Sequence, residues 1–295
     1  MSDLKTYLKR QQHTIDAALR RYLPRESARP STVHRAMRHP VFAGGKRLRP
    51  VLCLAAAEAC GGTTENAVAP ACALELIHTY SLVHDDLPCM DNDDLRRGHP
   101  TTHVVFGDNV AVLAGDGLLT EAFAIIAQTP ECRRFKTRDY VTELAWAADS
   151  RRLIGGQILD LEGEGRSLTK AELVRIHEAK TAALLTSSVR LGGMSANTTP
   201  ARLAALSDFG KSLGLAFQVI DDILALPEGV KSFGKELKIL DLCTSAMLDA
   251  ATLLDTPSTD APVIAAETEV IELLLQARRS NPNGGGGGGG SSPGG

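Results

Sequence analysis

Apolar residues recur at helical spacing along most of the chain, and no run alternates apolar with polar positions as a strand would. Four runs are rich in Ala, Leu, Ile and Val, at positions 71–86, 110–128, 169–191 and 199–226, and the first 23 residues also show helical spacing. Turns that contain Gly or Pro separate these runs. Because several runs are apolar on nearly every face, they are expected to be inner helices covered by others. The pattern predicts an all-α protein built as one large helical bundle.

The composition is ordinary for a soluble globular protein and narrows the choice of partner. The chain of 295 residues is 43% hydrophobic, 23% charged and 4% aromatic, with a net charge of −3. Few aromatics and no dominant basic run argue against nucleic acid as a partner. The six cysteines form no CxxC pair, which argues against zinc and a disulfide framework. No signal peptide is evident and no window approaches the roughly 18 apolar residues of a membrane span, so a cytoplasmic protein is expected.

Aspartates follow one of the apolar runs in a dense cluster. Five of them occur within ten residues: Asp85, Asp86, Asp91, Asp93 and Asp94. Buried together they would repel one another unless cations were present. Since the preceding residues resemble a core helix, the carboxylates are expected to open into an interior cavity, where they would suit Mg²⁺ with water and phosphate as further ligands. Pro88 would break the helix, and a turn there could bring Asp91 back beside Asp85.

A second acidic pair and several cation groups complete the candidate chemistry. Asp221 and Asp222 lie in an apolar helical run, with Gln218 on the same helix face as Asp221. Such a pair is costly without a metal or cations to compensate it. The cations are Lys46, Arg47, Arg49, Arg96, Arg97 and Lys180. Arg forks and Lys point charges hold diphosphates, so the combination suggests a diphosphate substrate bound through Mg²⁺.

These motifs resemble the trans-isoprenyl diphosphate synthase family, in order and spacing. The matching segments are Gly45-Lys46-Arg47-Leu48-Arg49-Pro50, His78 to His84 leading into Asp85-Asp86-(x)4-Asp91, Arg96-Arg97-Gly98, Gly155-Gly156-Gln157, Lys180-Thr181 and Phe217 to Asp222. The resemblance covers about residues 1–235 and implies the isoprenoid synthase type of helical bundle around a central cavity. It also implies a homodimer.

The resemblance implies a role for each matching residue. The catalytic set would be Asp85, Asp86, Asp91, Lys180 and Asp221. Of these, Asp85, Asp91 and Asp221 would be the Mg²⁺ ligands. Arg96, Lys180, Thr181 and Gln218 would contact the allylic diphosphate substrate. Lys46, Arg49, His78 and Arg97 would hold isopentenyl diphosphate, and Lys235 would also contact diphosphate.

Chain length would depend on residues one turn before the aspartates. Tyr80 and Ser81 lie five and four positions before Asp85. A bulky aromatic at the first position is typical of family members that stop at fifteen carbons, because a rigid ring blocks further growth. The resemblance therefore predicts farnesyl diphosphate as the main product, with geranylgeranyl diphosphate as the alternative.

The chain departs from the family pattern near its end. Ala225 stands where a third aspartate is usual, and after Lys235 the pattern is lost. We expect a synthase domain over residues 1–235, a divergent segment over 236–280 and a disordered Gly/Ser/Pro tail over 281–295. A shifted reading frame and true divergence both explain the segment. A weakly active or inactive structural or regulatory subunit is thus an alternative function. A class I terpene cyclase is another, although it should lack the isopentenyl diphosphate pocket.

Overall fold

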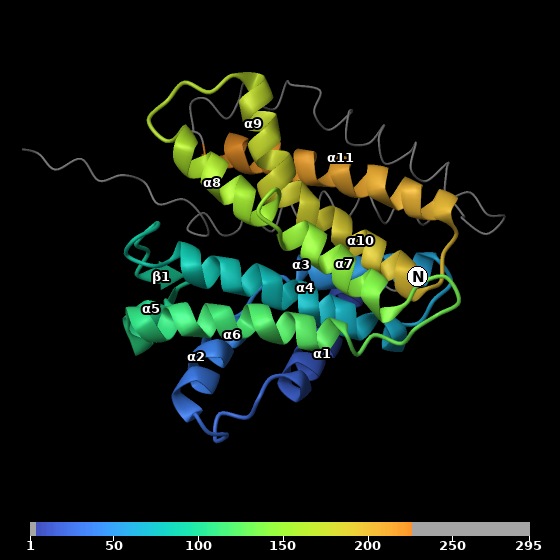
Figure 1. The fold of residues 1–295 in the computed structure, drawn as a ribbon, viewed down its shortest axis with the longest axis horizontal. Coiled ribbons are helices and arrows are strands. Elements are labelled where there is room, and N and C mark those ends of the chain that lie inside the picture. Colours follow the sequence, from blue (N-terminus) through green and yellow to red (C-terminus); the bar gives the residue numbers. More distant parts are fainter. Residues whose placement is uncertain (1–3, 226–295) are drawn as a thin grey trace, which may run out of the picture.

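A computed structural model describes residues 4–225, except for the side chains of Lys170 and of residues 219–225. Helices make up most of this part of the chain (Figure 1). In order they are α1 (Leu4–Tyr22), α2 (Ser31–Phe42), α3 (Leu48–Ala59), α4 (Thr64–Asp85), α5 (Thr102–Phe106), α6 (Asp108–Ile126), α7 (Thr137–Ala148), α8 (Leu153–Gly163), α9 (Lys170–His177), the π-helical turn η1 (Glu178–Ala182), α10 (Ala183–Ser195) and α11 (Pro200–Ala225). The predicted all-α bundle is confirmed.

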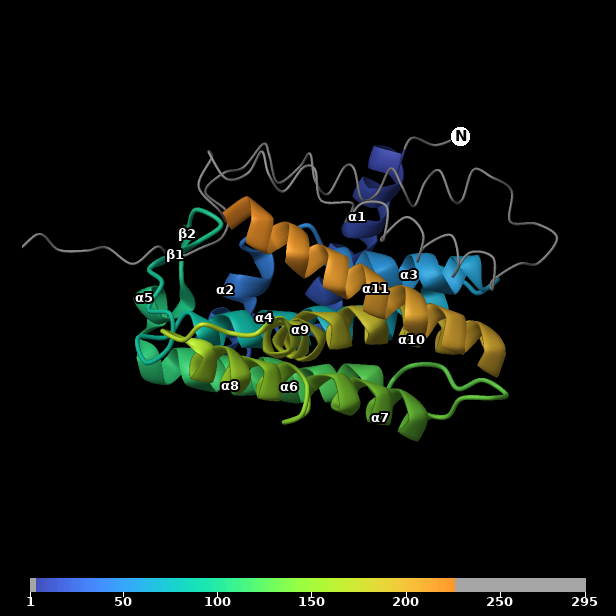
Figure 2. The ribbon, with the colours of Figure 1, turned by 90° about the horizontal axis from the view of Figure 1, so that it is seen from above.

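Helix α4 is the centre of the bundle. Residues 71–77 are all buried, so neighbours surround this helix on every side. It packs against α3, α6 and α10. Viewed from above, α6, α7 and α8 lie along one side of the bundle and α11 along the other (Figure 2). The acidic C-terminal end of α4 is thereby carried through the core to one end of the bundle.

The prediction that the chain has no strands was wrong at one place. Strands β1 (Leu95–Arg96) and β2 (His99–Pro100) form an antiparallel hairpin just after the aspartate cluster. Arg97 and Gly98 make the turn, both with positive φ (55° and 79°), which is the conformation of a tight hairpin turn. Strands of two residues are too short to produce an alternating pattern.

Helix α6 corrects a second expectation. Among the described residues it is the one helix whose length and hydropathy would let it cross a membrane. The expectation that no window is apolar enough for a membrane span was therefore wrong. However, α6 packs along α4 and α2, and 39% of its apolar window is buried. Core helices of soluble proteins pass the same test.

Candidate active site

The acidic end of α4 folds back as the proline predicted. Asp85 is the last residue of the helix and Asp86 is its C-cap. The backbone N–H of Asp91 donates to the carbonyl of Asp85 at 2.8 Å. The two residues therefore lie side by side although six positions separate them, which confirms the predicted turn.

Asp86 has a structural duty within this cluster. It is 4% exposed, and both Nε and Nη2 of Arg96 approach its Oδ1 at 2.6 Å. Asp93 lies 3.5 Å from the same guanidinium. Burial raises the pKa of Asp86, while Arg96 opposes that rise. Asp86 thus fixes Arg96 of the hairpin beside Asp85 and Asp91.

Nearby cations compensate the negative charge of Asp85 only in part. Burial, with repulsion from Asp91 and Asp86, raises its pKa to about 6, and Lys180 and Arg96 only partly oppose the rise. Among the side chains that the structure describes, which do not include those of residues 219–225, no group of three or more potential ligands gathers closely enough to hold a metal. Mg²⁺ usually takes one or two carboxylates and completes its shell with water and substrate phosphates. Asp85 and Asp91 fit that mode of binding.

Lys180 and Thr181 approach the same region from η1. Lys180 Nζ lies 2.5 Å from Asp160 Oδ2 of α8, and the Thr181 hydroxyl donates to Gln218 Oε1 of α11 at 2.8 Å. A side chain on Gly156 would clash with the backbone of Lys180, so glycine is needed for α8 to lie against η1. π-Helical turns are frequent at functional sites. The structure therefore brings Lys180, Thr181 and Gln218 together as predicted for one substrate.

The predicted residues at the far end of α11 are only partly described. Asp221 lies three positions after Gln218 on this helix, but its side chain is outside the described residues, as is that of Ala225. Lys235 lies wholly outside them. Their roles stay predictions.

Basic residues gather beside the acidic turn (Arg47, Arg49 and Arg97, with His78 among them), and this group is here called the cationic pocket. Arg47 is buried, with Nη1 2.7 Å from Glu75, Nε 2.9 Å from Asp16 and Nη2 donating to the Val41 carbonyl. Its charge is therefore neutralised inside the protein. Arg47 was among the cations that suggested a diphosphate substrate, although the family resemblance gave it no role, and this geometry gives it a structural one.

Arg49, His78 and Arg97 lie close enough to one another to affect each other's pKa. Burial and the neighbouring Arg97 lower the pKa of Arg49 to about 10, although Glu75 opposes the change. Burial and nearby arginines, Arg49 foremost, also lower the pKa of His78 well below its usual value. Arg97 donates to the Gly44 carbonyl, and Gly45 leaves room for its guanidinium. Arg49 and Arg97 thus repel each other, while the lowered pKa keeps His78 neutral at pH 7. An anion between the two guanidinium groups would relieve that repulsion.

Lys46 lies in the loop that leads into the cationic pocket and is exposed. Its carbonyl accepts a hydrogen bond from the Gln12 amide at 2.8 Å. This contact ties the loop to α1.

Tyr80 and Ser81 lie on α4 one turn before the aspartates. Tyr80 is 6% exposed and its ring meets that of His84 edge-on, at 5.8 Å between centroids. Its hydroxyl is buried with no hydrogen-bond partner among the described residues. The Ser81 hydroxyl donates to the His78 carbonyl at 3.0 Å, so it is used within the helix.

Two residues of the site were missed from the sequence. Glu75 is the one acid between Glu65 and Asp85, and Asp160 interrupts the apolar run of α8. Glu75 is an isolated charge in an apolar helix, a pattern that signals a buried ionic partner. Asp160 is half-exposed and shares α8 with Glu162, so its pattern gives no such signal. The partners, Arg47 and Lys180, are 28 and 20 positions away, which no local pattern specifies.

Comparison with known proteins agrees with this site. The polyprenyl synthetase family model matches residues 30–253, which runs past the predicted boundary at 235. The chain is 49% identical over 208 residues to a chloroplastic geranylgeranyl pyrophosphate synthase of Capsicum annuum, covering 70% of this chain and 56% of that one. It is 43% identical to farnesyl diphosphate synthase of Geobacillus stearothermophilus, covering 79% of this chain and 78% of that one.

A solved structure gives the same answer for the fold. The geranyltransferase of Legionella pneumophila matches with a TM-score of 0.80 and 28% identity, over 94% of this chain and 98% of that one. The family match covers well over half of the sequence, and the bundle, the acidic turn and the cationic pocket occur in the order its motifs predicted. The chain therefore belongs to the polyprenyl synthetase family, and it groups with the short-chain trans-prenyltransferases.

Proposed function

We propose that this protein condenses isopentenyl diphosphate with an allylic diphosphate, dimethylallyl or geranyl, to give farnesyl diphosphate. The observation that carries the proposal is the pairing of two unlike pockets: a carboxylate pocket around Asp85 and Asp91, and a cationic pocket around Arg49, His78 and Arg97. A single hairpin bears an arginine of each pocket, Arg96 and Arg97. The two pockets suit two diphosphates, one carried by metal and one not.

The residues would divide the work by charge. Asp85 and Asp91, with Asp221, would hold Mg²⁺, which supplies Lewis-acid stabilisation of the leaving diphosphate. Arg96 and Lys180 would neutralise that same diphosphate as the allylic C–O bond breaks and its electron pair leaves with oxygen. Thr181 and Gln218 would line the allylic chain.

The cationic pocket would orient the second substrate. Lys46, Arg49, His78 and Arg97 would bind the diphosphate of isopentenyl diphosphate, whose double bond attacks the allylic cation to form the new C–C bond. The released diphosphate would then take the proton that restores a double bond. The apolar interior around α4 would exclude water from the cation.

The direct test is transfer of radiolabel from isopentenyl diphosphate into an acid-labile product. We expect transfer with Mg²⁺, and none with chelator or in Asp85→Ala. Transfer that survives both changes would reject the proposed metal ligands. A folded protein with no transfer at all would favour the structural or regulatory subunit, which the unusual Ala225 also favours.

Product length rests on Tyr80. Its buried ring lies on the helix that leads to Asp85, where a growing chain would have to pass. A rigid aromatic ring should stop growth at fifteen carbons. We expect Tyr80→Ala to lengthen the product and Ser81→Ala to change it less. Relatives include both farnesyl and geranylgeranyl synthases, so wild-type protein that made chiefly twenty-carbon product would favour the alternative.

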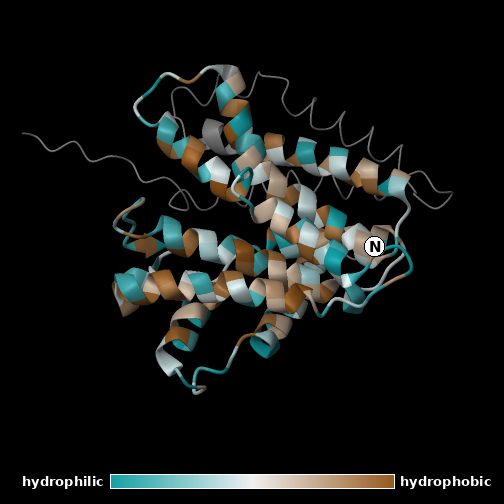
Figure 3. Ribbon diagram, viewed as in Figure 1, coloured by the Kyte–Doolittle hydropathy of each residue, from teal (hydrophilic) through white to brown (hydrophobic). Residues whose placement is uncertain are grey.

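We also propose a homodimer in the cytoplasm. Large apolar side chains are exposed on α8 (Ile154, Ile158 and Leu159) and on the contacting helices α5 and α6 (Val104, Val105, Val112 and Leu113), which present one apolar face. Figure 3 shows apolar segments along α6 and α8. A second copy could cover this face. Light scattering should give twice the chain mass, and Leu113→Asp should shift it toward the monomer.

A further inference from the structure

Polar contacts join the hairpin after the aspartate cluster to the rest of the protein, and the pairing of Arg96 with Asp86 at the end of α4 is one of them. Its own register pairs Leu95 with Pro100 and Arg96 with His99, and the Thr101 N–H donates to the Asp94 carbonyl at 3.0 Å. Two-stranded ribbons are marginally stable alone. The position of its arginines therefore depends on what anchors the hairpin from outside.

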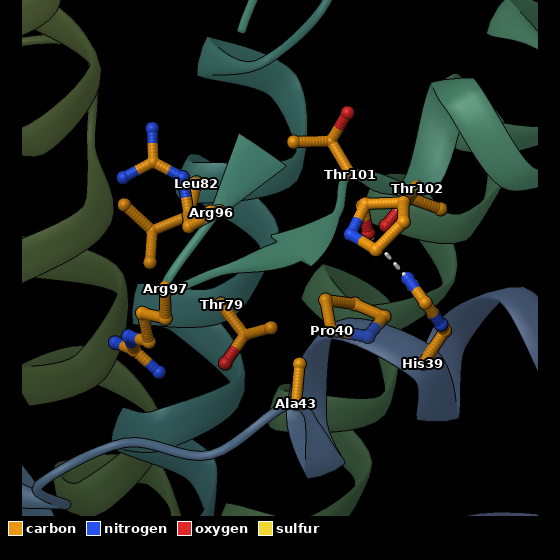
Figure 4. Close-up of a pocket in the computed structure, with 10 residues that line it drawn as sticks. His39, Pro40, Ala43, Thr79, Leu82, Arg96, Arg97, Thr101 and Thr102 are labelled. Carbon is orange, nitrogen blue, oxygen red and sulfur yellow. Dashed lines mark hydrogen bonds between the residues drawn. The ribbon is translucent and has the colours of Figure 1, made fainter. Parts of the chain in front are cut away.

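Helix α2 supplies an anchor from behind. His39 Nε2 lies 2.7 Å from the Pro100 carbonyl, and the His39 ring meets Phe106 edge-on, with centroids 5.6 Å apart. In Figure 4, Arg96 and Arg97 extend from the hairpin on the side away from His39. His39 is thus placed to hold the hairpin without touching the substrates.

Packing beneath the hairpin is incomplete. A cavity of about 30 Å³ lies between α2, α4 and the hairpin, lined by residues that include Thr79, Leu82 and Thr102 (Figure 4). The Thr102 hydroxyl is buried and has no hydrogen-bond partner in the described part of the chain. Because side chains do not fill this space, close packing does not fix the hairpin there, and the polar anchors matter more.

A second contact between the hairpin and the region of α2 involves Arg97, a side chain proposed to bind substrate. Arg97 donates to the carbonyl of Gly44, in the loop that follows α2. A diphosphate bound by Arg97 would compete with the Gly44 carbonyl for its N–H donors. The bond from His39 to Pro100 involves no side chain proposed to bind substrate, so it links α2 to the hairpin whether or not a diphosphate is bound.

We propose that His39 is a positioning residue which fixes Arg96 and Arg97 together, and so sets the affinity for both diphosphates at once. The inference rests on the proposed function. A residue that acted in one pocket would affect one substrate, whereas a shift of the hairpin moves both arginines and so affects both substrates.

The test uses the full chain with three substitutions. His39→Phe keeps a ring beside Phe106 but removes the donor, His39→Gln keeps a donor, and His13→Phe alters an exposed histidine on α1. We expect His39→Phe to raise the KM of both substrates about fivefold, the value of one hydrogen bond, with kcat changed less. His39→Gln should restore both KM values to within about twofold, and His13→Phe should have no effect.

A second measurement does not need activity. Hydrogen exchange at the hairpin amides, residues 95–101, should be faster in His39→Phe than in wild type and His13→Phe, with unchanged melting temperature. Unchanged KM values, a rise for one substrate only, or unchanged hairpin exchange would overturn the inference. An inactive wild type with faster hairpin exchange in His39→Phe would reject the proposed function while leaving the anchor in place.

Discussion

The two charged pockets at the end of α4 treat their charges in opposite ways. In the acidic pocket Asp86 is paired with Arg96, while burial and the adjacent carboxylates raise the pKa of Asp85. In the cationic pocket Arg47 is paired with Glu75, while burial and Arg97 lower the pKa of Arg49. Each pocket thus contains one ion pair that stabilises its structure and a further charge, Asp85 or Arg49, that its surroundings destabilise.

The difference in sign separates the ligands. An anion can enter the cationic pocket directly, whereas it reaches the acidic pocket only with cations. Under the proposed function, the two diphosphates would therefore be distinguished by their need for metal rather than by their shape near the phosphates. The central claim is that allylic diphosphate binding requires Mg²⁺ and isopentenyl diphosphate binding does not.

The largest effect is expected on the stability of the fold, when the buried ion pair of Arg47 and Glu75 is broken. Glu75→Gln leaves the buried Arg47 charge with less compensation, and the loss of one partner of a buried pair costs about 3–5 kcal/mol of unfolding free energy. Urea unfolding measures it, with the exposed Glu164→Gln as control. A loss no larger than that of the control would show that Arg47 does not depend on Glu75.

Removal of a ligand-binding charge should affect turnover instead of folding. Asp85→Asn should lower kcat/KM by at least about a hundredfold, comparable to the loss of one preorganised transition-state contact. The exposed neighbour Asp94→Asn is the matched control and should retain most activity. Steady-state kinetics at saturating Mg²⁺ decide the matter. Equal losses of kcat/KM in Asp85→Asn and Asp94→Asn would show that the overall negative charge of the cluster matters and that Asp85 has no special role.

Single cations should separate the substrates. Arg49→Ala should raise the KM of isopentenyl diphosphate by about tenfold or more, and Lys180→Ala that of the allylic substrate, since charge-assisted hydrogen bonds contribute about 1.5–3 kcal/mol. Lys9→Ala, an exposed cation on α1, is the control. If the two effects were exchanged, the assignment of the pockets would be wrong.

The smallest effect concerns stability against pH. The pKa of Asp85 is about 6 in the folded protein against an ordinary value of 3.8. Ionised Asp85 therefore destabilises the fold at pH values above about 6, and this cost disappears as the pH falls toward 3.8. Without Mg²⁺, Asp85→Asn should melt about 2–4 °C above wild type at pH 8, with the gap closing near pH 4. A gap that widened on acidification would contradict the raised pKa.

The sequence predicted those features whose signals are long or locally complete. Helix α11 was expected over 199–226 and spans Pro200–Ala225, because an extended apolar run leaves little choice. The return of Asp91 to Asp85 followed from Pro88 alone. The run at 169–191 was expected as one helix, and the structure divides it by the π-helical η1, which α8 contacts through Gly156.

The features that escaped prediction depend on distant neighbours. The pairing of Lys180 with Asp160 is set by how α8 packs against η1, and that of Arg47 with Glu75 by how the start of α3 meets α4. The hairpin escaped because its strands contain two residues each. Tertiary packing fixes all three, and periodicity carries no signal of it.

Calorimetric titration of each substrate, with Mg²⁺ and with chelator, tests the central claim most directly. A non-ionisable geranyl thiolodiphosphate represents the allylic substrate. We expect isopentenyl diphosphate to bind wild type and Asp85→Asn with or without Mg²⁺, and Arg49→Ala poorly in both cases. The allylic analogue should bind wild type only when Mg²⁺ is present, and Asp85→Asn not at all. Binding of both ligands that depends equally on Mg²⁺, or is equally indifferent to it, would contradict the division into two pockets.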